Sequence, residues 1–167
     1  MDCRFDLEIP RGTCYMGTDE LVGIVESIGP ELQCGVISDA YLNERALYMW
    51  QPTKPLRLAD LTSGTALIHG VTNELSSMFP YAVPQQWAAA FTTIAEGVFY
   101  RSRFDTRIPA RAVAHFGPSG LSPRAKGRQQ LVTANIRMRL TDEFGIQIAG
   151  PPSLSQLRVA SNPSVGN

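Results

Sequence analysis

Apolar residues recur at helical spacing over residues 19–28. Four of them fall at positions i, i+3, i+4 and i+7, namely Leu21, Ile24, Val25 and Ile28. This spacing predicts a helix with one apolar face, and its acidic start suits the positive end of the helix dipole. Gly29 and Pro30 predict the end of the helix. Glu26 lies beside the apolar face, next to Val22, so we expect its carboxylate at the edge of the packed surface, where a cleft would open.

A second helical pattern covers residues 83–96. Pro84 suits the first turn of a helix, and Gly97 suits its C-terminal end. The predicted apolar stripe consists of Trp87, Ala90, Phe91 and Ile94. We expect this helix to lead directly into a strand over residues 98–100.

Short segments rich in β-branched and aromatic residues predict further strands. They cover residues 13–16, 42–50, 56–61, 111–116 and 145–149. Alternation of apolar and polar residues favours one more strand over residues 131–140, although a helix that leads into Phe144-Gly145 is the alternative. The remaining predictions are a short helix over 65–71, irregular chain over 30–41, a loop over 117–129 and a disordered tail over 150–167. Because helices and strands do not alternate regularly, we predict a single α+β domain over residues 1–149.

The composition of the 167 residues is that of a globular protein, with 44% hydrophobic and 18% charged residues. Lysine plus arginine and aspartate plus glutamate number 15 each, so the formal net charge is zero and direct nucleic-acid binding is not expected. The chain has no apolar run of about 18 residues and no apolar signal core, which predicts a cytoplasmic protein without a membrane partner. We expect no metal site and no prosthetic group, and buried reduced thiols at three widely spaced positions, Cys3, Cys14 and Cys34.

Three polar residues at the ends of separate predicted elements carry the candidate chemistry: Arg4, Glu26 and Ser102. The chain has no P-loop, G-x-G-x-x-G, G-x-S-x-G or H-E-x-x-H motif. An arginine binds phosphate oxygens through its planar fork, a carboxylate stabilises developing positive charge, and a hydroxyl orients a substrate. The set therefore suits chemistry on a dinucleotide.

Each candidate residue also has a purely structural interpretation. Glu26 is then a solvated residue of a surface helix, and Arg4 is a surface residue. Ser102 caps the end of a strand, and Tyr15 is a core residue. A weaker candidate for phosphate contact is Arg103, for which the alternative is a salt bridge with one of two nearby carboxylates, Asp105 or Glu96.

Four stretches of the chain resemble, in order, the RES domain family, which is named after an arginine, a glutamate and a serine. They are RFDLEIPRGTCYMGTDELVGIVESIG, LRLADLTSG, YAVPQQWAAAFTTIAEGVFYRSRFD and ARAVAHFG. The first stretch places Arg4, Tyr15 and Glu26 at equal intervals of eleven positions, as in the family, and the third ends in a Tyr-x-Ser-Arg segment that contains Ser102. The resemblance covers roughly residues 4–117, and its specificity lies in the order of the stretches.

The resemblance implies a fold like that of the ADP-ribosyltransferase toxins, with NAD⁺ as substrate. RES domains are typically toxins of bacterial toxin–antitoxin pairs that hydrolyse or phosphorolyse NAD⁺, or transfer ADP-ribose to a protein. The resemblance implies that Arg4 contacts the phosphates or ribose and that Tyr15 packs by the nicotinamide. It also implies that Glu26 supports the scissile ribose and that Ser102 orients the nicotinamide or ribose. The implied partner is a helix-turn-helix antitoxin.

RES domains carry an early strand, with another arginine and tyrosine, before the segment that resembles Arg4-Phe5-Asp6. Since the sequence begins three residues before Arg4, it lacks this strand, either because the start codon was placed too late or because the protein is shortened. In the second case we expect a sheet edge and a wall of the NAD⁺ pocket to be exposed. An exposed edge makes pairing with an antitoxin or a second copy of the chain plausible. Three hypotheses result: an NAD⁺-consuming enzyme, a degenerate RES fold that only binds a partner protein, and an enzyme that transfers ADP-ribose to a protein.

Overall fold

The computed structural model describes residues 3–120, 128–151 and 153 of the chain. The elements in chain order are β1 (Arg11–Gly17), α1 (Glu20–Leu32), β2 (Val36–Ser38), α2 (Asp39–Asn43), β3 (Ala46–Met49), β4 (Leu58–Asp60), the 3-10 helices η1 (Gly64–His69) and η2 (Asn73–Ser76), α3 (Ala82–Phe91), β5 (Gly97–Arg101), β6 (Arg111–Pro118), β7 (Arg128–Leu131), α4 (Ala134–Phe144) and β8 (Gln147–Ala149). The predicted α+β class is confirmed.

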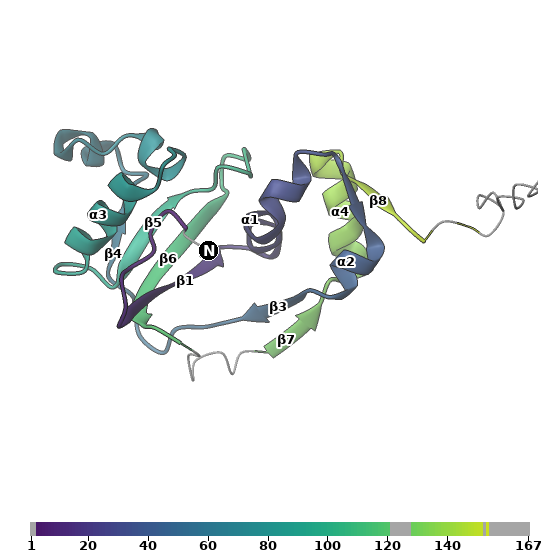
Figure 1. Cartoon of the computed structure of the whole chain (residues 1–167), viewed down its shortest axis with the longest axis horizontal. Coiled ribbons are helices and arrows are strands. Elements are labelled where there is room, and N and C mark those ends of the chain that lie inside the picture. The colour runs from purple at the N-terminus through teal and green to yellow at the C-terminus, as the bar shows by residue number, and fades with distance from the viewer. Residues whose placement is uncertain (1–2, 121–127, 152, 154–167) are drawn as a thin grey trace, which may run out of the picture.

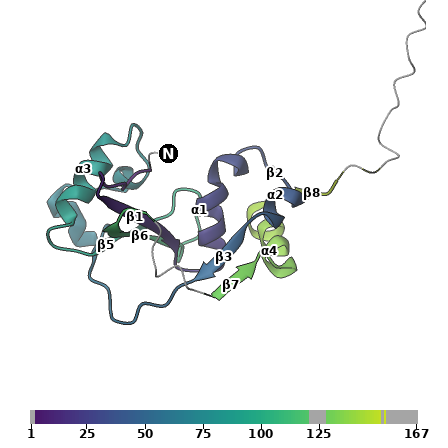
Figure 2. The ribbon, with the colours of Figure 1, turned by 60° about the horizontal axis from the view of Figure 1, so that its bottom comes forward.

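The main sheet has the strand order β1-β6-β5-β4 (Figure 1). Strand β6 is antiparallel to both of its neighbours, whereas β4 and β5 are parallel. Two short ribbons lie apart from it, the parallel pair β2–β8 and the antiparallel pair β3–β7. Figures 1 and 2 both show α1 between the main sheet and α4, while α3 lies at the other end, next to β4 and β5.

Helix α1 contributes to both apolar cores of the fold. Val22 packs with alternate residues of β5 and β6 in the first core, together with Phe5, Ala88 and residues of the 3-10 helices. The second core joins α1 to α4 and the short elements, and its α1 members are the predicted row Leu21, Ile24, Val25 and Ile28. Since Glu26 follows Val22 by one helical turn, it lies on the side of α1 that faces the sheet.

The predicted end of α1 at Gly29-Pro30 is wrong, because the helix continues to Leu32 with Pro30 inside its last turn. Gly29 has a packing role instead. A Cβ atom at this position would lie 2.2 Å from Cε2 of Phe104, so the missing side chain lets the Phe104 ring rest on the helix. The glycine therefore marks a contact between α1 and the segment that follows Ser102.

Helix α3 ends at Phe91 rather than at residue 96. The hydroxyl groups of Thr92 and Thr93 donate to carbonyls of the last helical turn, at 2.7 and 2.8 Å, which favours a turn over a continued helix. Of the predicted stripe, the rings of Trp87 and Phe91 pack against the core. The other two members of the stripe, Ala90 and Ile94, are exposed, so this part of the prediction is wrong.

The strand predicted over residues 131–140 is wrong, and the helical alternative is what the structure shows in α4. Thr133 caps its N-terminus, with Oγ1 accepting from the Ile136 amide at 3.3 Å, and Gly145 ends it in the left-handed conformation with φ 67°. Ile136 and Leu140, four positions apart, are buried, whereas Met138 is exposed. One helical face is thus buried, and the apparent period of two has no structural counterpart.

Other boundaries differ in detail. The irregular segment predicted over 30–41 contains β2 and most of α2, and α2 also replaces the start of the strand predicted over 42–50. The short helix predicted over 65–71 is the 3-10 helix η1, and the strands predicted over 13–16, 56–61, 98–100, 111–116 and 145–149 correspond to β1, β4, β5, β6 and β8. Part of the predicted loop, 121–127, and nearly all of the predicted tail lie outside the described residues.

Two of the three cysteines contradict the prediction of buried thiols, since Cys14 and Cys34 are exposed. Cys14 lies on β1 between Thr13 and Tyr15, and successive residues of a strand face opposite sides. Tyr15 packs against the core, so Cys14 faces outward. In the part of the chain that the structure describes, no helix has the length and apolar character needed to cross a membrane.

Candidate functional site

The structure brings Arg4, Glu26 and Ser102 together around one carboxylate. Arg4 Nη2 donates to Glu26 Oε2 at 3.1 Å, across 22 positions of sequence. Ser102 Oγ donates to Glu26 Oε1 at 2.6 Å, across 76 positions. The three side chains come from the turn before β1, from α1 and from the end of β5. The fold therefore joins the three residues that the sequence singled out.

A third donor to the carboxylate, Tyr100, was missed by the sequence analysis. Its hydroxyl donates to Glu26 Oε2 at 3.2 Å, and its side chain is fully buried. Burial raises the pKa of Tyr100 well above its ordinary value, and the negative charge of Glu26 raises it further. The period of two in strands would have identified it, because Tyr100 lies two residues before Ser102 and so faces the same side.

The Arg4 guanidinium is enclosed by its partners. Nη1 donates to the Ser76 carbonyl at 2.5 Å, and Cζ lies 5.5 Å from the centre of the Tyr100 ring, within range of a cation–π contact. Nε is buried and has no acceptor among the described residues. The side chains of Arg4 and Glu26 are only 7% and 11% exposed, so this is a buried ion pair rather than a surface one.

Tyr15 supports the turn that carries Arg4. Its hydroxyl accepts from the Phe5 amide at 2.8 Å and donates to Asp6 Oδ1 at 3.0 Å. Burial, with a smaller contribution from the Asp6 carboxylate, raises the pKa of Tyr15 far above its ordinary value. The ring packs against the first core. These contacts give Tyr15 a structural role in the turn, and its hydroxyl has no described hydrogen bond to Glu26 or Ser102.

Ser102 starts a tight turn that directs its hydroxyl toward α1. Oγ accepts from the amides of Phe104 and Asp105, at 3.2 and 3.0 Å. With both amides donating to Oγ, its own proton is directed to Glu26. The Phe104 ring against Gly29 holds the same turn on the helix. The position of Ser102 is thus set by backbone hydrogen bonds on one side and by packing on the other.

Arg103 lies outside this cluster. It is exposed, and its guanidinium carbon lies 4.4 Å from the centre of the Phe104 ring. The salt bridges considered for it are taken by other cations in the described structure, since Asp105 pairs with Arg107 and Glu96 with Lys54. Arg103 therefore has neither of the two ion pairs that were its structural alternative.

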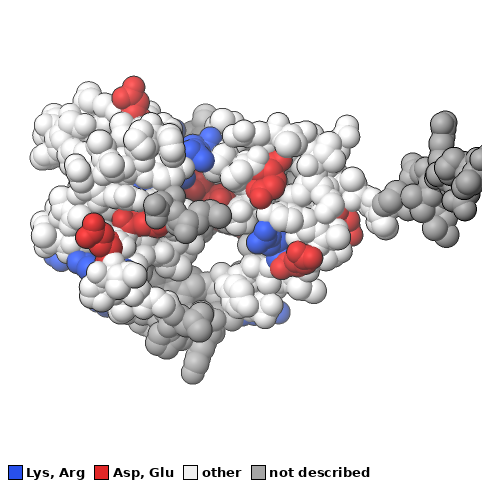
Figure 3. All heavy atoms as spheres, viewed as in Figure 1, with Lys and Arg blue, Asp and Glu red and all other residues white. Residues whose placement is uncertain are grey.

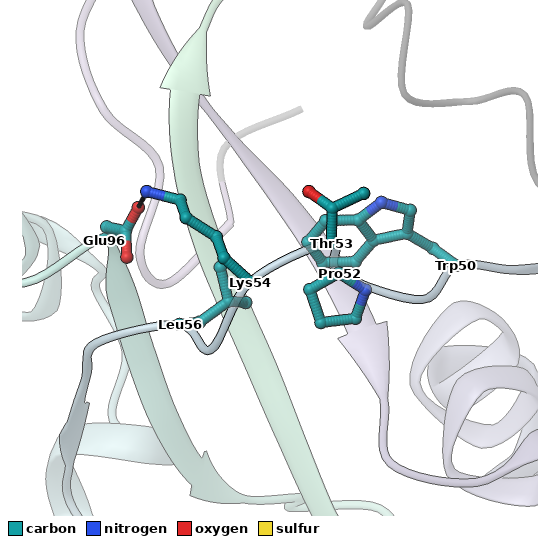
Figure 4. A pocket seen from close by; sticks show the side chains of 6 residues that line it. All are labelled: Trp50, Pro52, Thr53, Lys54, Leu56 and Glu96. Carbon is teal, nitrogen blue, oxygen red and sulfur yellow. Dashed lines mark hydrogen bonds and ion pairs between the residues drawn. The ribbon is translucent and has the colours of Figure 1, made fainter.

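Two surface hollows of the described structure are lined by other residues, and neither includes Arg4, Glu26 or Ser102. The larger, about 470 Å³, runs between the turn before β1 and one side of α3; its lining residues include Asp6, Glu8, Arg11, Gln85 and Gln86. The smaller, about 110 Å³, is drawn in Figure 4, where Lys54 reaches Glu96 at one end of the hollow and the ring of Trp50 lies at the other end. On the face shown in Figure 3, acidic and basic side chains are dispersed rather than gathered in one patch.

No group of three or more histidine, cysteine, aspartate or glutamate side chains in the described ranges is arranged to hold a metal ion. A comparison of the chain with known protein families, curated proteins and solved structures found no match. The resemblance to RES domains therefore rests on the residues of this chain alone.

Proposed function

We propose that this chain is an RES-type enzyme that cleaves the nicotinamide–ribose bond of NAD⁺, by hydrolysis or phosphorolysis. In this proposal it acts in the cytosol as the toxin of a toxin–antitoxin pair. The observation that carries the proposal is the convergence of Arg4 and Ser102 on the Glu26 carboxylate. These are the positions that correspond to the arginine, glutamate and serine of the family name, and they come from three separate elements.

The energetic cost of this cluster supports a functional interpretation. A buried ion pair is often no more stable than apolar residues of the same size, because both charges lose their hydration. Here the pair also includes a buried guanidinium N–H without an acceptor among the described residues, which adds a further desolvation cost. A pair that is costly to bury and contributes little net stability is more readily explained by a functional role than by a role in holding the fold.

The chemistry proceeds through bond breaking at C1′ of the ribose. The electron pair of the C–N bond moves to the nicotinamide nitrogen and neutralises its positive charge, while an oxygen of water or phosphate bonds to C1′. The ionised Glu26 carboxylate stabilises the oxocarbenium-like centre in between. When water attacks, its proton passes to the solvent.

Binding of the dinucleotide requires the cluster to open, because Glu26 is almost enclosed and both of its oxygens accept hydrogen bonds. In the proposal, Arg4 leaves the carboxylate and binds the pyrophosphate, as the resemblance implies. Ser102 turns from Glu26 to the nicotinamide or the ribose. Tyr100 then remains the donor that keeps Glu26 in place.

The same enclosure favours a second candidate, a degenerate RES fold that only binds a partner protein. In that case the cluster is a structural network that joins α1 to the sheet, and it never opens to a substrate. The two hollows that avoid the cluster agree with this alternative. A measurement of turnover separates the two candidates.

The test is release of free nicotinamide from NAD⁺ by purified protein, with and without phosphate. We expect release by the wild type and its loss in Glu26→Gln, which keeps the shape of the side chain and removes its charge. Glu31→Gln is the matched control, because Glu31 lies on the same helix, is exposed, and its carboxylate accepts one described hydrogen bond, from the Tyr41 hydroxyl. A wild type that neither binds NAD⁺ nor releases nicotinamide contradicts the proposal and favours the partner-binding fold.

The acceptor of ADP-ribose is decided by the same reaction mixture. Dependence on phosphate indicates phosphorolysis, and free ADP-ribose indicates hydrolysis. A mass increase on proteins of a cell extract supplied with NAD⁺ would instead establish transfer to a protein. In the toxin proposal, a helix-turn-helix antitoxin or a second copy of the chain binds at an edge of the sheet and limits the reaction.

A further inference from the structure

Arg107 joins the elements that carry Glu26 and Ser102. Its Nε and Nη2 donate to the carboxylate of Asp105, with distances of 2.5–3.1 Å. Nη2 also reaches Asp19 at 3.5 Å, and Nη1 donates to Glu143 at 2.9 Å. One guanidinium therefore contacts the turn after β5, the N-terminal cap of α1 and the end of α4.

Asp105 and Asp19 are the two contacts that matter for the candidate site. The Asp105 side chain is fully buried, and its own amide donates to Ser102 Oγ. Asp19 caps α1 by accepting from the Val22 amide at 2.8 Å, and Glu26 follows Val22 by one turn. Arg107 is thus linked through Asp105 to the turn that holds the Ser102 hydroxyl, and through Asp19 to the helix that carries Glu26.

The charge of Arg107 suits this arrangement. The hydrogen bonds that Arg107 donates to the Asp105 carboxylate, together with the charge of that carboxylate, raise the pKa of Arg107 above its ordinary value. A bidentate arginine–carboxylate contact fixes geometry as well as charge, which a lysine cannot do. The Arg107 side chain is 25% exposed, so substitution there disturbs the packing of the core less than a change at Asp105.

We infer that Arg107 is a positioning residue that holds the Ser102 turn on the N-terminus of α1 and so sets the position of the Ser102 hydroxyl beside the Glu26 carboxylate. The inference rests on the proposed function for its catalytic consequence, and on geometry alone for its structural part. Arg107 touches none of the three cluster residues through its side chain, so its effect passes through Asp105 and Asp19.

The experiment follows two readouts in Arg107→Lys, which keeps the charge and removes the bidentate contact. The first is hydrogen exchange of the Phe104 and Asp105 amides, measured by NMR. The second is kcat and KM for nicotinamide release. We expect both amides to exchange about tenfold faster and kcat to fall about tenfold with KM nearly unchanged, since small misplacements at a reacting centre cost this much or more.

Two further variants make the test decisive. Arg139→Lys is the matched control, because Arg139 also binds Glu143, at 2.7 Å, but has no described ion pair or hydrogen bond with Asp105 or Asp19. We expect wild-type values for both readouts. If Arg107→Lys does not fold, the double variant Asp105→Asn/Arg107→Gln removes both charges and leaves no unpaired buried carboxylate.

Unchanged exchange of the two amides in Arg107→Lys, or in the double variant, overturns the inference whatever the activity. Faster exchange with unchanged kcat also overturns it, because the turn would then be irrelevant to the reaction. If the wild type releases no nicotinamide while the amides lose protection, the proposed function fails and the structural part of the inference stands.

Discussion

Replacement of Arg4 by methionine tests whether the Arg4–Glu26 pair is buried in solution. Methionine fills a similar volume without charge, and it leaves the Glu26 carboxylate with only two hydroxyl donors, from Tyr100 and Ser102. Breaking a buried pair by removing one partner costs about 3–5 kcal/mol, whereas removing both charges is often close to neutral. Because the two hydroxyls still solvate Glu26, we expect a loss of about 3 kcal/mol in the free energy of unfolding for Arg4→Met.

The double variant Arg4→Met/Glu26→Leu isolates the interaction. It removes the unpaired charge but leaves the Tyr100 and Ser102 hydroxyls without their acceptor, which costs about 1–3 kcal/mol. We expect it to be about 2 kcal/mol less destabilised than the sum of the two single variants, measured by urea unfolding at pH 7. The control is Arg139→Met, which breaks an exposed pair on α4 and should cost less than about 0.5 kcal/mol. A cost below about 1 kcal/mol for Arg4→Met, with additive single variants, would refute the buried pair.

Three further predictions concern the surroundings of the pair. Gly29→Ala drives a Cβ atom into the Phe104 ring, so we expect a loss of about 1–3 kcal/mol in urea unfolding and a lower kcat; wild-type stability would show that Phe104 does not rest on α1. Tyr100→Phe keeps the ring but removes one donor to Glu26, and we expect about tenfold lower kcat with unchanged KM; equal kcat would exclude Tyr100 from the site. Because folding raises the pKa of Tyr15 and of Tyr100, their contribution to stability is complete below the unfolded value near 10 and is lost as pH rises above it. Urea unfolding between pH 8 and 11 should show this decline, and a smaller one in Tyr15→Phe, whereas a flat profile would contradict it.

The helix carrying Glu26 could be predicted because its signal is local. The apolar row at i, i+3, i+4 and i+7 and the acidic start were sufficient for the core-facing side of α1. Its predicted C-terminal end is wrong, because Gly29 and Pro30 are typical of a helix stop, whereas here the glycine makes room for Phe104, 75 positions further along the chain. A requirement created by a distant ring leaves no local trace in the sequence.

Residues 131–140 show the opposite limit. Their alternation fits a strand, but Thr133 and Gly145 are suited to the two ends of a helix, and these caps agree with what the structure shows. The alternation with a period of two arises because single polar residues separate the apolar ones. Between the two caps, only Ile136 and Leu140 are buried. The capping residues are the better indicator of structure in this segment than the periodicity, since they satisfy backbone groups that a short helix would otherwise leave without partners.

The three named members of the candidate site could be predicted from the sequence, but the residues that hold them in place could not. Arg4, Glu26 and Ser102 were singled out by residue type and by the order of the resembling stretches. Tyr100 and Arg107 were missed for different reasons. The strand period would have identified Tyr100, whereas the contacts of Arg107 with α1 and α4 depend on tertiary structure that no spacing indicates.

The position of Glu26 on α1 narrows its possible roles. A solvated residue of a surface helix, the simplest interpretation from sequence, is wrong, because the side chain faces the sheet and accepts three described hydrogen bonds. The remaining roles are a permanent structural acceptor and a carboxylate that exchanges its donors for a substrate. The two roles predict different effects of substitutions at Arg4. If Glu26 is a permanent structural acceptor, removal of Arg4 affects only stability. If Glu26 exchanges its donors for a substrate, the conservative Arg4→Lys, which keeps a charge near Glu26, raises KM for NAD⁺, because a lysine does not bind two pyrophosphate oxygens as a fork. A folded Arg4→Lys variant with unchanged KM and active turnover would therefore remove Arg4 from substrate binding and leave Glu26 and Ser102 as the candidates for contact with NAD⁺.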